Sequence, residues 1–182
     1  LLNEDGTIRE TSTINDLQPN VPDFVEANFA FGASVANIGD RDGDGVNDMA
    51  VGADSADVNM TVLLVGTVFT VLLNQDGTAK SAVEMNTDDP DLGLYIRDSF
   101  GSAVADIGDR NGDGTSDIVI GVPGDEAGLR AAAGFNHGSL YVVYMTPLIR
   151  MINSTVEINA ESDGLELRTS SIASVASLGD FD

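Results

Sequence analysis

Short apolar segments separated by polar turn residues run along most of the chain. Segments 34–38 (SVANI) and 48–52 (DMAVG) cluster small and β-branched residues, and 67–73 (TVFTVLL) and 139–145 (SLYVVYM) are apolar runs preceded by glycine. Runs of this length and composition are typical of β-strands. A sustained 3.6-residue apolar period with helix caps is not found in the sequence. The pattern therefore predicts an all-β protein.

The longest apolar stretch is the segment 62–73 (VLLVGTVFTVLL). This segment is too short to cross a bilayer, so we interpret it as two strands that meet near Gly66 and expect no direct membrane insertion. The dipeptide Asp76-Gly77 that follows is typical of a hairpin turn.

The sequence repeats itself. The segment FGASVANIGDRDGDGVNDMAVGA begins at Phe31, and the similar segment FGSAVADIGDRNGDGTSDIVIGVP begins at Phe100. A second element, LLNEDGTIRETSTIN at 1–15, returns as LLNQDGTAKSAVEMN at 72–86. A third, partial copy of the first element occupies 171–182. Two elements that share one period indicate a repeat architecture.

Each repeat unit holds about four predicted strands in ~70 residues, which is the content of one propeller blade. We divide the chain into the end of a preceding unit and its connection (1–30), unit 1 (31–99), unit 2 (100–170) and the start of a third unit (171–182). One unit cannot bury both faces of its sheet alone, so units need neighbours. A closed propeller and an open stack of units both satisfy this need.

Charge narrows the choice of partners. The chain carries 30 acidic and 8 basic residues, a net charge of −22. With so few cations to neutralise phosphates, nucleic acid is excluded as a partner, and an anionic membrane surface would repel the protein. The sequence has no cysteine, so disulfides neither stabilise the protein nor indicate its compartment.

The acidic residues concentrate in two loops with one spacing. Carboxylates at alternate positions of a tight loop point toward a common centre and suit a hard cation with six to eight oxygen ligands, which is Ca²⁺. The glycines at position 6, Gly45 and Gly114, permit the sharp turn. The ligands at positions 1, 3, 5, 7 and 9 are Asp40, Asp42, Asp44, Val46 (by its carbonyl) and Asp48 in the first loop, and Asp109, Asn111, Asp113, Thr115 and Asp117 in the second.

Other metal sites fit the sequence less well. An EF-hand needs a glutamate at position 12 and flanking helices, whereas position 12 of the first loop is Val51 and the flanks are predicted strands. The loops of a dockerin-type pair would lie much closer together in the sequence than these two loops do. With no cysteine and with His137 alone, zinc and copper lack a ligand set. The remaining alternative is a metal-free turn rich in aspartate and glycine.

The motifs Phe31-Gly32, the acidic loop and Gly52-Ala53 resemble the FG-GAP repeat of the β-propeller in integrin alpha chains. Phe100-Gly101 and Gly121-Val122-Pro123 form the second copy. The resemblance implies blades of four antiparallel strands, with calcium in the hairpin loop between the first two strands, bound by the two ligand sets named above. It also implies that Asp180 and Asp182 begin a third site, although Ser171-Ile172 replaces Phe-Gly there.

Function follows from these features as an expectation. No nucleophile–base constellation accompanies His137, so we expect no enzyme activity. The sequons at Asn59 and Asn153 predict glycosylation and an extracellular or cell-surface protein. We expect a calcium-stabilised, non-enzymatic repeat module of an adhesion component or surface fibre that assembles with copies of itself. The alternative is a propeller that binds an extracellular protein or a glycan, although the absence of Trp disfavours a lectin.

Overall fold

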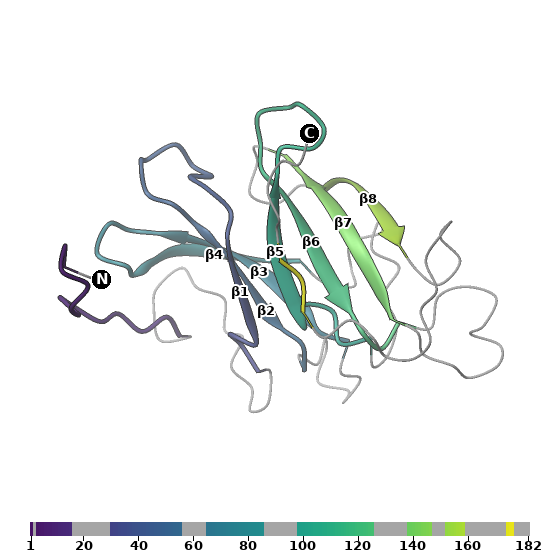
Figure 1. Cartoon of the computed structure of the whole chain (residues 1–182), viewed down its shortest axis with the longest axis horizontal. Helices are drawn as coiled ribbons and strands as arrows, with labels where there is room; N and C mark the ends of the chain where they lie inside the picture. Colours follow the sequence, from purple (N-terminus) through teal and green to yellow (C-terminus); the bar gives the residue numbers. More distant parts are fainter. Residues whose placement is uncertain are drawn as a thin grey trace.

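The computed structural model describes residues 1, 3–15, 30–55, 65–85, 98–125, 138–146, 152–158 and 174–176. These residues form two four-stranded antiparallel sheets (Figure 1) and contain no helix. The all-β prediction is therefore confirmed. Sheet 1 consists of β1 (Ser34–Asn37), β2 (Met49–Ala53), β3 (Thr67–Leu73) and β4 (Ala79–Met85), and sheet 2 of β5 (Ala103–Gly108), β6 (Asp117–Val122), β7 (Ser139–Met145) and β8 (Ile152–Ile158).

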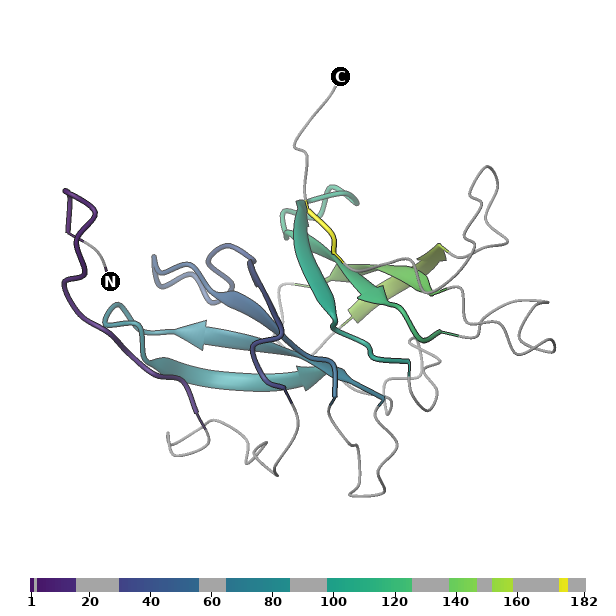
Figure 2. The same cartoon turned by 60° about the horizontal axis from the view of Figure 1, so that its bottom comes forward.

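Both sheets are simple meanders in which each strand pairs with the next. The registers correspond: Val51 lies opposite Phe69 in sheet 1, and Ile120 lies opposite Tyr141 in sheet 2. Each sheet also has a register shift at the same place, between its third and fourth strands. The two sheets are thus copies of one blade-like unit, and they lie as an open pair that does not close into a ring (Figure 2).

The predicted hairpin turn is present between β3 and β4. The amide of Asn74 donates to the Thr78 carbonyl at 2.8 Å, and Thr78 N donates to Asp76 Oδ1 at 2.9 Å. The N-terminal copy forms the same turn, with Asn3 N on the Thr7 carbonyl at 2.8 Å. The sequence repeat therefore extends to individual hydrogen bonds. Of the two strands predicted within 62–73, the second is β3, and the first lies largely outside the described residues.

A core joins the two units. Alternate residues of a strand point to opposite faces of its sheet. One face of sheet 1, with Ala50 and Val68, packs in a single buried cluster with Ile118 and Ile120 of sheet 2. The other face of sheet 1, with Val51, Phe69 and Val71, is also buried, and Ile14 and Phe31 pack against it. Sheet 1 is therefore apolar on both faces, as expected for a unit that stacks between neighbours.

The Phe-Gly motif of unit 2 docks on unit 1 at very short range. Phe100 is fully buried, its amide donates to the Val65 carbonyl at 2.9 Å, and it forms an isolated parallel bridge with Gly66. A Cβ atom on Gly52 would lie 2.0 Å from the Gly101 carbonyl oxygen, which leaves room only for glycine. Gly101 itself has a φ of +87°, in the left-handed region. The motif therefore holds the units together.

In the described part of the chain, no helix has the length and hydropathy needed to span a membrane.

Candidate metal centre

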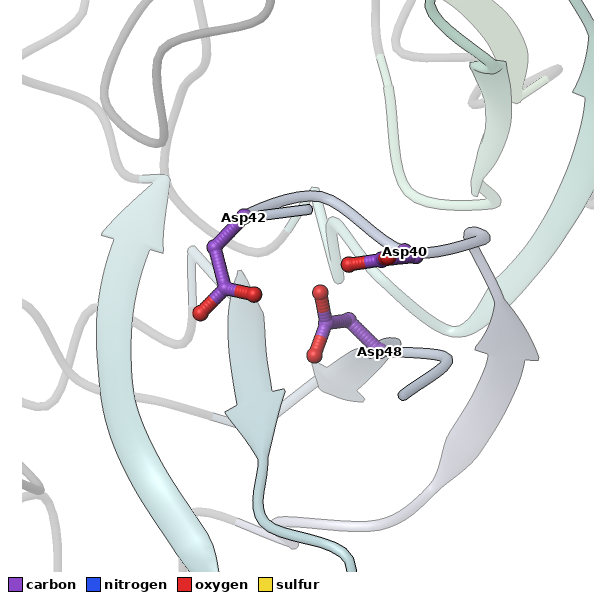
Figure 3. Close-up of side chains that lie close together, drawn as sticks. All are labelled: Asp40, Asp42 and Asp48. Carbon is purple, nitrogen blue, oxygen red and sulfur yellow. The ribbon is translucent and has the colours of Figure 1, made fainter. Parts of the chain in front are cut away.

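The two acidic loops connect the first two strands of each unit, β1 to β2 and β5 to β6, near the upper edge of the view in Figure 1. Oxygens of Asp40, Asp42 and Asp48 lie within 4.8 Å of one another (Figure 3). Calcium binds oxygens at 2.3–2.6 Å, so one ion can contact oxygens up to about 5 Å apart. The donor atoms are hard carboxylate oxygens at suitable spacing, and the first loop thus fits a calcium ion.

The first aspartate of each loop folds the loop around itself. Asp40 Oδ1 accepts from Gly43 N at 2.8 Å, and its Oδ2 accepts from Gly45 N at 2.8 Å. Asp109 repeats both contacts, with Gly112 N and Gly114 N at 2.7 Å each. These bonds turn consecutive amides inward and require positive φ at the glycine of position 6, which is +88° at Gly45. Each loop is thus shaped by its own sequence.

The aspartate at position 9 ties each loop to the third strand. Asp48 accepts from Arg41 N at 2.7 Å and from Leu73 N, at the end of β3, at 2.9 Å. Asp117 accepts from Arg110 N at 2.7 Å and from Met145 N at 3.0 Å. Both carboxylates are almost fully buried. The sequence pattern predicts position 9 only as a metal ligand and does not reveal this anchoring role.

Burial raises the pKa of Asp48, since desolvation outweighs the two backbone hydrogen bonds. The neighbouring carboxylates of Asp40 and Asp42 act in the same direction. The ionised form of Asp48 is therefore the costly one in this site. A bound divalent cation would offset that cost.

Arg41, at position 2 of the first loop, connects the loop to unit 2. Its guanidinium donates to the Ser116 carbonyl at 3.4 Å and also to the Thr146 carbonyl. A cavity of about 380 Å³ lies between the two loops, lined by Asp40 and Arg41 on one side and by Asp113 and Ser116 on the other. The two acidic loops are therefore neighbours in space and share a bridging arginine.

The ammonium group of Lys80, on β4, contacts two carboxylates of the first loop. Its Nζ lies 2.6 Å from Asp42 Oδ2 and 2.8 Å from Asp44 Oδ2. The hydrogen bond from Lys80 lowers the pKa of Asp44, and the two carboxylates raise the pKa of Lys80. Asp44 stands apart from the three-carboxylate group, and its Oδ1 accepts from Val46 N at 2.9 Å.

Unit 2 has no lysine, and in the second loop a side-chain amide contacts the carboxylate at position 5. Asn111 Nδ2 donates to Asp113 Oδ2 at 3.0 Å. This hydrogen bond lowers the pKa of Asp113. The amide of Thr115 donates to Asp113 Oδ1 at 2.8 Å, which matches the contact of Val46 in the first loop. The position-7 carbonyls of Val46 and Thr115 remain predicted ligands.

Several predicted site residues lie outside the described part of the chain. They are Asp180 and Asp182 of the third loop, Asn59 of the first sequon, and His137. Asn153 lies on β8, but its side chain is not among those described. A third calcium site and glycosylation at both sequons stay predictions.

Comparison with known proteins relates part of this chain to an integrin alpha chain. The chain is 34% identical over 98 residues to integrin alpha-PS5 of Drosophila melanogaster, which covers 53% of this chain and 9% of that protein. No family model matches the sequence. The chain thus aligns with a small part of a much longer relative. The similarity supports FG-GAP-like repeats, in agreement with the two all-β units.

Proposed function

We propose that this chain is a calcium-stabilised, non-enzymatic repeat module of an extracellular or cell-surface protein. The observation that carries the proposal is the duplicated acidic loop. Both loops lie between the first two strands of a unit, and in both the aspartates at positions 1 and 9 accept the same backbone hydrogen bonds. In the first loop, three carboxylates converge within 4.8 Å. The similarity to an integrin alpha chain supports an adhesion-type, surface-located module.

Calcium would act on stability in this module. Without a divalent cation, the first loop holds the carboxylates of Asp40, Asp42 and Asp48 close together, and Asp48 is buried. An ion bound only by the folded loop stabilises the fold by about 2.7 kcal/mol at a hundredfold excess over Kd. One ion in each loop would fix the β1–β2 and the β5–β6 hairpin. The hydrogen bonds of Arg41 would connect the first loop, once ordered, to unit 2.

We further propose that units, or copies of the chain, stack through their sheet faces. Ala50 and Val68 lie on the face of sheet 1 that packs against sheet 2. The corresponding residues of sheet 2, Val119 and Leu140, are half-buried, and Val156 beside them is 47% exposed. This apolar face of sheet 2 is suited to a further unit, and repeated head-to-tail contacts of this kind build filaments.

A ligand-binding role is the second candidate, because the alignment to an integrin alpha chain covers about half of this chain. In that case the partner would be an extracellular protein or a glycan. The cavity between the two acidic loops is the place where such a partner could contact both units.

Thermal unfolding in calcium, in magnesium and in excess chelator tests the calcium proposal. We expect the melting temperature to rise with calcium, to rise less with magnesium and to fall with chelator. A melting temperature that is the same in all three would contradict it. Electron microscopy of the same samples separates the two roles: filaments that need calcium support assembly, and isolated particles in every condition favour ligand binding.

A further inference from the structure

Lys80 is the only lysine in a sequence whose net charge is −22. Its ammonium contacts two neighbouring ligand positions of the first loop, at 2.6 Å from Asp42 and 2.8 Å from Asp44. The Lys80 side chain is 41% exposed and reaches the loop from β4. This arrangement places the positively charged ammonium of Lys80 beside the predicted calcium site.

The strand register identifies the residue that replaces Lys80 in unit 2. Lys80 lies within the register shift between the pairs Leu72–Ser81 and Leu73–Ala79. In sheet 2 the shift lies between the pairs Tyr144–Ser154 and Met145–Ile152, and the residue within it is Asn153. The flanking sequences agree, since KSAVEMN at 80–86 aligns with NSTVEIN at 153–159. The position of unit 2 that corresponds to Lys80 therefore carries no charge.

Unit 2 lacks both the lysine and one of the four carboxylates of the first site. Where the first loop has Asp42, the second has Asn111. Four aspartates with Lys80 give the first site a side-chain charge of −3, and three aspartates give the second site the same −3. Each loop also carries one arginine at position 2, and the charge of Arg41 acts on carboxylates of both loops. The two ligand sets differ in composition, and the first set together with Lys80 has the same charge as the second.

We propose that Lys80 is a built-in counter-ion that competes with calcium for Asp42 and Asp44 and so sets the affinity of the first loop. The inference rests on the proposed calcium function. One oxygen of each of these carboxylates is held by Lys80, and Asp44 stands outside the group formed by Asp40, Asp42 and Asp48. When Asp44 binds calcium, it gives up this contact or brings a positive charge close to the ion.

Both routes weaken calcium binding by the first loop. A unit charge about 5 Å from a divalent ion changes the affinity about tenfold in a solvent-exposed site, and salt screens the effect. Lys80→Gln should therefore bind calcium about tenfold more tightly at low ionic strength, with a smaller gain in high salt. Asn153→Lys should weaken the second loop by a similar factor.

The first test is calcium titration by calorimetry in the background Asp109→Asn, which weakens the second loop so that the first is observed. Lys80→Gln is compared with the unchanged first loop and with Arg9→Gln, a control that removes one positive charge from the exposed N-terminal segment. We expect tighter binding for Lys80→Gln and unchanged binding for Arg9→Gln. Equal gains in both variants, or none in either, would overturn the inference.

The second test uses the wild-type chain and needs no substitution. Because Lys80 is the only lysine, acylation by an amine-reactive ester reports on it directly, with the N-terminal amine as internal reference. We expect calcium to release Lys80 and to speed its acylation several-fold. Calcium binding with unchanged acylation and no gain in Lys80→Gln would mean that the ion pair is an ordinary surface contact. An absence of calcium binding in every variant would instead refute the proposed function.

Discussion

The two acidic loops share their shape and differ in how their charge is balanced. Positions 1 and 9 are aspartate in both copies and receive hydrogen bonds from the same backbone amides at closely similar distances. Position 3 differs, as Asp42 in one loop and Asn111 in the other, and so does the corresponding residue of the fourth strand. Backbone amides therefore determine the loop shape, and the remaining side chains set the charge that a cation meets.

The largest effect is expected where the loops agree. Asp48→Ala and Asp117→Ala each remove the acceptor for two backbone amides at nearly buried positions. Since an unpaired buried donor costs about 1–3 kcal/mol, each variant should lose about 3 kcal/mol of unfolding free energy, even in chelator. Urea unfolding measures this loss.

The matched controls for these variants are Asp42→Ala and Asn111→Ala, at exposed position 3. In chelator they should be clearly less destabilising than the position-9 variants. If the variants at positions 3 and 9 lost equal unfolding free energy in chelator, the anchoring role of Asp48 and Asp117 would be refuted.

A smaller effect is expected for the arginine at position 2. Arg41 donates to two carbonyl groups of unit 2, so Arg41→Ala should cost about 2 kcal/mol of unfolding free energy. Arg110→Ala is the matched change in the other loop. We expect urea unfolding to show a smaller loss for Arg110→Ala, and equal losses in the two variants would argue against a bridge specific to Arg41.

The next prediction concerns two substitutions that give the first loop the ligand types of the second. Asp42→Asn alone leaves Lys80 with one carboxylate fewer to balance it, and should weaken calcium binding about tenfold. Adding Lys80→Gln should restore the affinity, because the double variant has the same charge and ligand types as the second loop. Calorimetric titration of the single and double variants checks this charge balance. A double variant that binds calcium as weakly as Asp42→Asn alone would contradict the role assigned to Lys80.

Much of this arrangement could be predicted from local sequence. The runs at 34–37 and 139–145 are strands, Asp76-Gly77 forms a hairpin turn, and the acidic loop lies between the first two strands of each unit. These features depend on residues close together in the chain. Strand propensity, turn residues and the spacing of aspartates are therefore sufficient to locate them.

The contacts that distinguish the loops depend on longer-range structure. Lys80 reaches Asp42 across 38 positions because of the register shift between β3 and β4. Arg41 reaches Thr146 in the other unit because the glycines Gly52 and Gly101 allow the sheets to approach closely. A sequence pattern specifies neither the register of paired strands nor the distance between two sheets. The single lysine in so acidic a chain was nevertheless a signal that could have been followed.

Native mass spectrometry of the metal-free chain with added calcium tests the central claim most directly, because it counts bound ions. The account predicts that both complete loops bind, and that Asp40→Asn and Asp109→Asn each remove one ion from the count. Calcium adducts that are absent, or that persist unchanged in the double variant Asp40→Asn/Asp109→Asn, would contradict the assignment of these loops as calcium sites.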